Sequence, residues 1–189
     1  MATDSLETYD SDALGGAPTA TYRVLDTYDE TLSDEGQKLL RRQLRRTLPR
    51  FDALAGTTVT VARMPPSKDT LREPHALAQP WNRIVQFQPA ETPSNMTLFH
   101  ELAHLAIFEK EQAGHDLPRY SEEFCSLYAL VRMKPGEIFA ERIPYFGEVE
   151  APIDEWPEIA EAALEYRAER GYNSHYVQHA RDLFEEGLQ

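Results

Sequence analysis

The chain has 189 residues, 41% of them hydrophobic and 27% charged, a composition typical of a soluble globular protein large enough to bury its own core. Acidic residues outnumber basic ones by 32 to 19, which gives a formal net charge of -13 and argues against general binding to nucleic acid, because two polyanions repel each other. No apolar run approaches the roughly 20 residues that cross a bilayer, so we expect no membrane partner.

The N-terminal part of the chain is expected to hold a tail and a helix. Residues 1–20 are acidic, contain few apolar side chains and include the run GGAPTA, which is typical of a flexible tail. Ser33 is a suitable N-cap for a helix that runs to about Leu48, just before Pro49. This helix carries a dense basic cluster, which we interpret mainly as a solvated face that balances nearby acids: Arg41, Arg42, Arg45 and Arg46.

Strand patterns also occur in this part of the chain. Three segments have the alternation or the β-branched content of strands: 21–28, 57–64 and 83–88. Between the last two, residues 65–81 are interrupted by prolines and are expected to form a loop.

The second half of the chain is expected to be helical. Thr92 as N-cap and Pro93 in the first helical position open a helix that contains the stretch LFHELAHLAIF. A further helix is predicted over 119–133. After an irregular segment, two amphipathic helices, 154–170 and 173–186, complete the pattern.

Strands followed by helices indicate an α+β fold. We expect a small sheet packed on the helix that carries HELAH and on the helix after it, with a helical C-terminal part. Residues 21–189 then form a single domain, in which 57–135 make up the core and 154–186 the C-terminal helices.

The HELAH stretch has the spacing of a metal site. His100 and His104 lie one turn apart, so both imidazoles project from one face of the helix within roughly 40° of each other. Three leucines lie on the opposite side, where they can be buried: Leu98, Leu102 and Leu105. This separation favours a metal site over a merely apolar helix, because two imidazoles one turn apart can reach a single zinc ion at about 2 Å.

Glu101 projects beside the two histidines, displaced by about a quarter turn. It can therefore contact a zinc-activated water without binding the metal. We expect Glu101 to act as general base in the hydrolysis of a peptide bond and to pass the proton on to the leaving amine. His175 and His179 are also four residues apart, but Tyr176 stands where the base is needed, so we interpret that pair as surface helix.

A catalytic zinc needs a third protein ligand and one open position. A metzincin requires glycine at position 107 and histidine at position 110, and this chain has Ile107 and Lys110. Three other candidates follow in the sequence: Glu122, Glu123 and His115. Helix phase favours Glu122, whose face carries small and apolar residues that let two helices approach. Glu123 projects between leucines instead, and His115 lies in a turn that would have to fold back.

HELAH followed by SEEFCSLYAL resembles the gluzincin clan of zinc metallopeptidases, in particular the small ImmA/IrrE-type peptidases. In that clan a helix with the pattern Glu-x-x-(Ala/Ser)-(Asn/Asp/Ser) supplies the third ligand, and here the pattern falls on Glu122, Cys125 and Ser126. The resemblance covers residues 83–135. It implies a small zincin-like sheet, bound Zn2+ and a peptide or protein substrate. Many members carry Asn or Asp where this chain has Ser126, and that side chain would brace a histidine ligand.

The resemblance also implies features of substrate binding. The strand over 83–88 is expected to edge the cleft and to pair with an extended peptide by β-addition. A residue that stabilises the oxyanion is expected too, and Tyr145, His115 and Tyr120 are the candidates. Cys125 is not expected to be a nucleophile, because it lies mid-helix among apolar neighbours.

Other interpretations of the sequence stay open. The chain could be a structural or adaptor component of a viral particle or other assembly that keeps a zincin fold with little turnover, or a regulatory peptidase with one specific partner. Its one cysteine suits a reducing interior and its N-terminus lacks a signal-peptide pattern, so the cytoplasm is expected, or the virion in the adaptor interpretation. The acid-rich composition, with only four lysines, resembles that of salt-loving archaea and their viruses.

Overall fold

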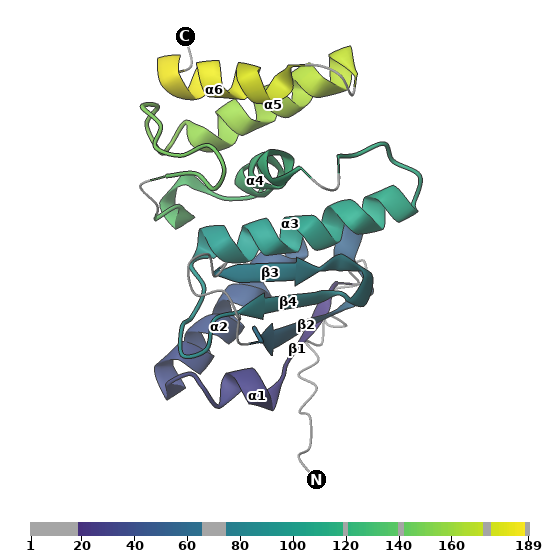
Figure 1. Ribbon diagram of the computed structural model, residues 1–189, viewed down its shortest axis with the longest axis vertical. Coiled ribbons are helices and arrows are strands. Elements are labelled where there is room, and N and C mark those ends of the chain that lie inside the picture. The colour runs from purple at the N-terminus through teal and green to yellow at the C-terminus, as the bar shows by residue number, and fades with distance from the viewer. Residues whose placement is uncertain (1–18, 66–74, 119–120, 140–141, 172–174, 188–189) are drawn as a thin grey trace. The chain divides into compact units, whose positions relative to one another are not determined.

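The computed structural model (Figure 1) describes residues 19–65, 75–118, 121–139, 142–171 and 175–187. The predicted tail, residues 1–20, lies almost wholly outside these ranges. The chain forms two compact units, residues 1–93 and residues 94–189, and the prediction of a single domain stays a prediction. The described residues form a four-stranded sheet and six α-helices, which confirms an α+β fold. None of these helices is both long enough and apolar enough to span a bilayer.

The first unit contains the sheet, made of β1 (Thr21–Val24), β2 (Thr58–Arg63), β3 (Ala76–Gln79) and β4 (Ile84–Phe87). The strands lie in the order β1-β2-β4-β3. β2 is parallel to both β1 and β4, whereas β3 is antiparallel to β4. Parallel neighbours need a long crossover, and between β1 and β2 it contains α1 (Asp26–Asp29) and α2 (Asp34–Thr47).

The predicted strands form where the side chains are β-branched and buried. In β2 four consecutive residues, 59 to 62, are buried, as expected of an interior strand. β1 is shorter than the predicted strand over 21–28, because the chain turns after Leu25 into α1. Tyr28 of α1 is fully buried, and its hydroxyl donates a hydrogen bond to the carbonyl oxygen of Glu91 at 2.6 Å.

The helix predicted after Ser33 is confirmed as α2. The Ser33 hydroxyl accepts a hydrogen bond from the backbone N–H of Gly36 at 3.1 Å, as an N-cap does. Of the basic cluster, Arg41 donates two hydrogen bonds to the Asp29 carboxylate, at 2.8 and 2.9 Å. Short 3-10 helices follow α2 and recur later in the chain: Leu48–Arg50, Asp52–Leu54, Pro80–Asn82 and Pro135–Glu137.

The edge strand β3 departs from the sequence prediction, which placed a loop over 65–81. Residues 76–79 have little intrinsic β propensity, so their pairing with β4 accounts for the strand. The amide of Gln79 supports this pairing by donating a hydrogen bond to the Gln86 side chain at 2.9 Å. The prediction that 83–88 pairs with a peptide is therefore wrong, because β4 is already hydrogen-bonded on both sides, to β2 and to β3.

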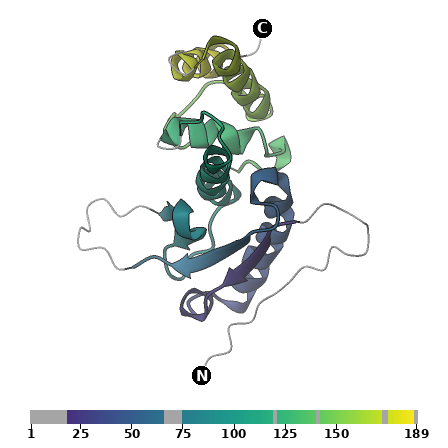
Figure 2. The same cartoon turned by 90° about the vertical axis from the view of Figure 1, so that its right-hand side faces the viewer.

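In the second unit the described residues form four α-helices, α3 (Asn95–Gln112), α4 (Glu122–Leu130), α5 (Trp156–Arg170) and α6 (Tyr176–Glu186). Each packs on the next one along the chain, α3 on α4, α4 on α5 and α5 on α6. Figure 2, turned by 90°, shows α5 and α6 side by side. The four predicted helices are thus present, and α4 brings its N-terminal residues to α3.

Serine caps mark the starts of α3 and α4. Helix α3 begins after Ser94, whose hydroxyl accepts a hydrogen bond from the Thr97 N–H at 3.1 Å. The predicted cap at Thr92 is therefore wrong by two residues, because Pro93 and Ser94 still belong to the extended chain before the helix. Helix α4 begins after Ser121, whose hydroxyl accepts from the Phe124 N–H at 3.1 Å.

Candidate metal centre

Helix α3 supplies two histidines to the site. His100 and His104 are one turn apart, and their ring centroids are 4.9 Å apart with the ring planes at 80°. The helix is anchored by apolar residues that are fully buried: Leu98, Leu102 and Leu105. The His100 ring is also buried, so its position is fixed before any ligand binds.

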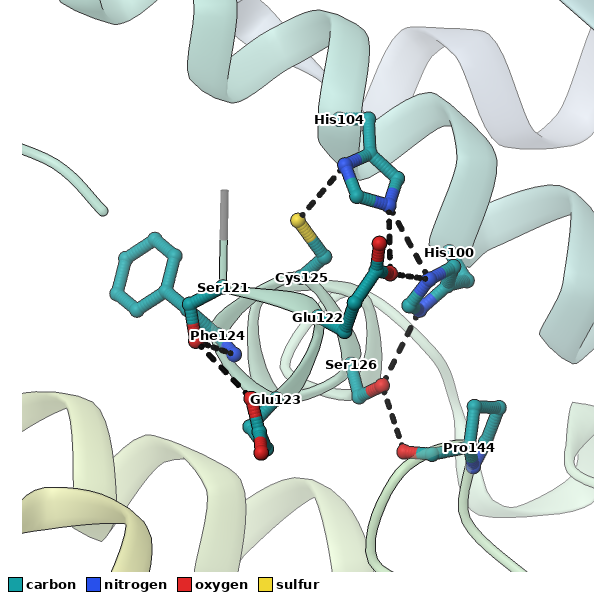
Figure 3. A network of polar contacts seen from close by, with 9 residues as sticks. All are labelled: His100, His104, Ser121, Glu122, Glu123, Phe124, Cys125, Ser126 and Pro144. Atoms are coloured by element: carbon teal, nitrogen blue, oxygen red, sulfur yellow. Dashed lines mark hydrogen bonds and ion pairs between the residues drawn. The ribbon is translucent and has the colours of Figure 1, made fainter. Parts of the chain in front are cut away.

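Helix α4 supplies a carboxylate to the same point. The Oε2 atom of Glu122, the first residue after the Ser121 cap, lies 3.0 Å from Nε2 of His100 and 3.0 Å from Nε2 of His104. The two nitrogens are themselves 3.2 Å apart. Figure 3 shows the three side chains pointing at one another from the two helices. They are close enough to hold a metal ion.

The outer nitrogen of His100 is held by Ser126. The Ser126 Oγ lies 3.1 Å from Nδ1 of His100 and donates its own hydrogen to the carbonyl oxygen of Pro144 at 2.8 Å. Because a hydroxyl has one hydrogen, Ser126 can only accept from His100, so Nδ1 carries the proton. In a neutral imidazole Nε2 then presents its lone pair toward Glu122, which is the tautomer that binds a metal.

The contact between the neutral His100 ring and the Glu122 carboxylate is unfavourable without a cation. Burial lowers the pKa of His100, and the hydrogen bond to Glu122, which would raise it, does not offset this. Burial would raise the pKa of Glu122, but the contacts with His100 and His104 outweigh it and hold that pKa well below its usual range. The part of the Glu122 shift that comes from His100 requires this ring to donate a proton from Nε2. The buried ring is neutral, however, and its one proton is on Nδ1, where it is donated to Ser126. A lone pair then faces a carboxylate oxygen at 3.0 Å, and a bound cation would remove this repulsion.

The outer nitrogen of His104 contacts a thiol. The Cys125 Sγ lies 3.2 Å from Nδ1 of His104 and is fully buried. Burial, followed by the negative charges of Glu122 and Glu101, raises the pKa of the thiol far above its ordinary value. A thiol that stays protonated is a poor nucleophile, which agrees with the expectation that Cys125 does not attack a substrate.

Tyr145 lies against the site. Its ring stacks on His100 with centroids 5.4 Å apart, and it sits in a turn closed by the pairing of Ile143 with Gly147. Its backbone φ of 66° is left-handed, a conformation that a tyrosine adopts only when its surroundings impose it. Tyr145 is 56% exposed overall. Partial burial, the charge of Glu122 and a hydrogen bond to that carboxylate raise its pKa to about 12, so the phenol keeps its proton at neutral pH.

Helix α6 holds the turn that carries Tyr145. The guanidinium of Arg181 donates a hydrogen bond to the backbone carbonyl of Tyr145 at 3.2 Å and lies 5.3 Å from the centre of the Phe146 ring. Phe146 also packs edge-on against Phe184, with centroids 5.4 Å apart. The C-terminal helix therefore contributes to the site through a turn that sequence analysis described only as irregular.

Glu101 adjoins the site but is not one of the three converging residues. It is 7% exposed and follows His100 directly on α3. Its charge contributes to the raised pKa values of Cys125 and Tyr145, which places the carboxylate within electrostatic reach of the metal position. It is thus near the site and separate from the converging ligand atoms.

The other sequence candidates lie apart from this group. Glu123 points away from the histidines (Figure 3) and accepts a hydrogen bond from the Ser121 hydroxyl at 3.3 Å. His115 is exposed and is not part of the group, and Tyr120 lies outside the described residues. Of the second pair, His175 is exposed and His179 stacks on Tyr166 with centroids 4.4 Å apart.

The contact between Cys125 and His104 was not predicted from the sequence. The spacing of Glu122, Cys125 and Ser126 on one helix could have indicated it, because residues three and four apart share a face. The contacts of Pro144 and Arg181 had no such signal, since they depend on how distant segments pack.

Comparisons of the chain with protein-family models, with curated proteins and with solved structures found no match.

Proposed function

We propose that the chain is a zinc-dependent metallopeptidase in which His100, His104 and Glu122 hold the metal and Glu101 is the general base. The observation that carries the proposal is the approach of three ligand atoms to within 3.0–3.2 Å of one another. The resemblance of residues 83–135 to the gluzincins supports the reaction class, and their zinc site has the same three ligand types.

The donor set favours zinc. Two imidazole nitrogens and one carboxylate oxygen are ligands of catalytic zinc sites, which leave a fourth position open. Bonds of about 2.0–2.2 Å from a tetrahedral ion put neighbouring ligand atoms roughly 3.3 Å apart, close to the distances in this site. When bound, zinc polarises a carbonyl group and makes water a better nucleophile at neutral pH.

Glu101 moves the proton in this proposal. Its carboxylate accepts a proton from the attacking water and delivers it to the amine that leaves when the peptide bond breaks. Its position supports this role, because the buried Glu101 directly follows the ligand His100 on α3. The role requires Glu101 to act without binding the metal, and it stands apart from the three converging residues.

Tyr145 stabilises the oxyanion in this proposal. Its ring stacks on the ligand His100 and its hydroxyl is hydrogen-bonded to the ligand Glu122, so the phenol adjoins the position where a substrate carbonyl would develop negative charge. A phenol with a pKa of about 12 is a hydrogen-bond donor at neutral pH, and such donors are worth about 10²–10³ in kcat in other oxyanion sites.

The experiment compares the wild-type chain with Glu101→Gln. Both are purified in high salt with zinc, metal content is measured by elemental analysis, and cleavage of a peptide library is followed by mass spectrometry. We expect the wild type to hold one zinc and to cleave peptides, and Glu101→Gln to keep zinc and lose cleavage.

A matched control uses two neighbouring acids. Glu123→Gln, outside the ligand group, should leave both zinc and cleavage unchanged, whereas Glu122→Gln should lose both. A wild-type protein that binds no zinc under these conditions would rule out the proposal. One that holds zinc but cleaves neither the peptide library nor casein would contradict peptidase activity and favour an adaptor role.

A further inference from the structure

One face of α4 serves both histidines of the site. Glu122, Cys125 and Ser126 stand at positions i, i+3 and i+4, which share a face of a helix. Glu122 contacts the two inner nitrogens, Ser126 contacts the outer nitrogen of His100, and Cys125 contacts the outer nitrogen of His104. Both Cys125 and Ser126 are fully buried. A single helix therefore supplies a ligand and both supporting contacts.

The two supporting contacts differ in the direction in which they can act. The direction of the Ser126 contact is fixed, because the hydroxyl donates its hydrogen to the Pro144 carbonyl and can only accept from His100. A thiol can donate or accept, and the Sγ of Cys125 lies 3.2 Å from Nδ1 of His104. In the hydrogen bond with His104, Cys125 can therefore be either the donor or the acceptor. Which of the two it is depends on whether the proton of the imidazole is on Nε2 or on Nδ1.

Without a metal, the favourable arrangement puts the proton of His104 on Nε2. That N–H then donates to the Glu122 carboxylate at 3.0 Å, a charge-assisted hydrogen bond, while the thiol donates to Nδ1. With a metal on Nε2, the imidazole proton can reside only on Nδ1, and the sulfur becomes its acceptor. His100 undergoes no such change, since Ser126 fixes its proton on Nδ1 in both states.

We propose that Cys125 is a positioning residue whose hydrogen bond with His104 reverses when the metal binds, as a donor in the metal-free protein and as an acceptor in the loaded one. The Nε2 proton of His104 passes to solvent, Nδ1 takes up a proton from solvent, and the thiol keeps its own hydrogen, so both the imidazole and the thiol stay neutral. The inference rests on the proposed metal site but not on peptidase turnover.

The test records the tautomer of each histidine in the full-length chain labelled with 15N-histidine. Two-bond 1H–15N spectra are measured at about pH 8, where a histidine with an ordinary pKa is neutral, first after removal of metal with a chelator and then with one equivalent of zinc. We expect His104 to change from the Nε2–H to the Nδ1–H form and His100 to be Nδ1–H in both spectra. A His104 with the same tautomer in both states would overturn the proposal.

Variants separate positioning from packing. Cys125→Ala removes the hydrogen-bond partner of His104 Nδ1 and should weaken zinc binding by about tenfold. This is the lower end of the loss of affinity seen when a residue that hydrogen-bonds to a metal ligand is removed. Cys125→Ser keeps a group that donates and accepts, and should restore most of the affinity and the tautomer change. Leu127→Val removes buried volume from the same helix and should change neither. An unchanged zinc affinity in Cys125→Ala would contradict the proposal, and the wild-type spectra decide it if that variant does not fold.

These readouts use zinc alone, so they can fail independently of the proposed function. A protein that shows the tautomer change but cleaves no peptide keeps this inference and loses the peptidase proposal. A protein that cleaves peptides with zinc while His104 keeps one tautomer loses this inference and keeps the peptidase proposal.

Discussion

The chain contains two histidine pairs with the same spacing, and only one lies in a cluster that could hold a metal within the described residues. His100 and His104 point at a carboxylate from a second helix, and each outer nitrogen has a partner of its own. In the other pair His175 is the N-cap residue of α6 and is exposed, and His179 stacks on Tyr166. A spacing of four residues therefore brings two imidazoles together, but a metal site also requires a third donor and fixed rings.

The largest effect on zinc binding is expected from the loss of a histidine ligand. His100→Ala removes a proposed zinc ligand. Loss of a residue that only hydrogen-bonds to a ligand lowers metal affinity by about 10–100-fold, so loss of the ligand itself should lower zinc affinity by more than that. His175→Ala is the matched control and should bind zinc like the wild type. Isothermal titration with zinc measures both, and equal losses in the two variants would contradict the assignment of the site to α3.

Next in size is the replacement of the third donor. Glu122→Gln keeps the shape of the side chain but removes its charge, and an amide is a poor zinc ligand, so affinity should fall by about 100-fold or more. Glu123→Gln has the same chemistry one residue away and should retain wild-type affinity. If Glu123→Gln were the weaker binder in the same titration, the convergence on Glu122 would not be the metal site.

A smaller effect is expected at the partner of His100. Ser126→Ala leaves the Nδ1–H of His100 without its acceptor, so zinc affinity should fall by about tenfold. The fold should persist, because the change removes one small polar atom. The result is checked by zinc titration together with circular dichroism, and a loss of zinc accompanied by loss of helical signal would indicate unfolding instead.

The smallest effect concerns the metal-free protein and acidity. The folded-state pKa of His100 lies below its ordinary 6.5, so on acidification the unfolded chain takes up the proton first. The stability that this group contributes is complete above about pH 6.5 and is lost as the pH falls below it. Urea midpoints of the metal-free wild type should therefore decrease from about pH 7.5 to about pH 5.5, and those of His100→Ala should decrease less. Equal slopes would show that His100 is not held neutral.

Local sequence signals located most of the helices. Ser33 and the residues after it predict α2, and the stretch LFHELAHLAIF lies wholly inside α3. Such signals are reliable because a cap and an apolar repeat act within one or two turns of the same segment. Ser94 and Thr92 show the limit, since both are good capping residues and the extended chain at Pro93 and Ser94 selects the later one.

What the sequence alone determined is the α+β class, the pair His100 and His104 on one helical face, and three candidates for the third donor, of which helix phase favoured Glu122. Only the tertiary structure brought the Glu122 carboxylate to both histidines and left Glu123 and His115 outside the group. It also formed β3 from a segment with little strand propensity and brought Cys125, Ser126 and Tyr145 to the histidines. The physical reason is range: helix periodicity and capping depend on neighbours in the chain, whereas the convergence of donor atoms depends on how α4 and the turn after it pack against α3.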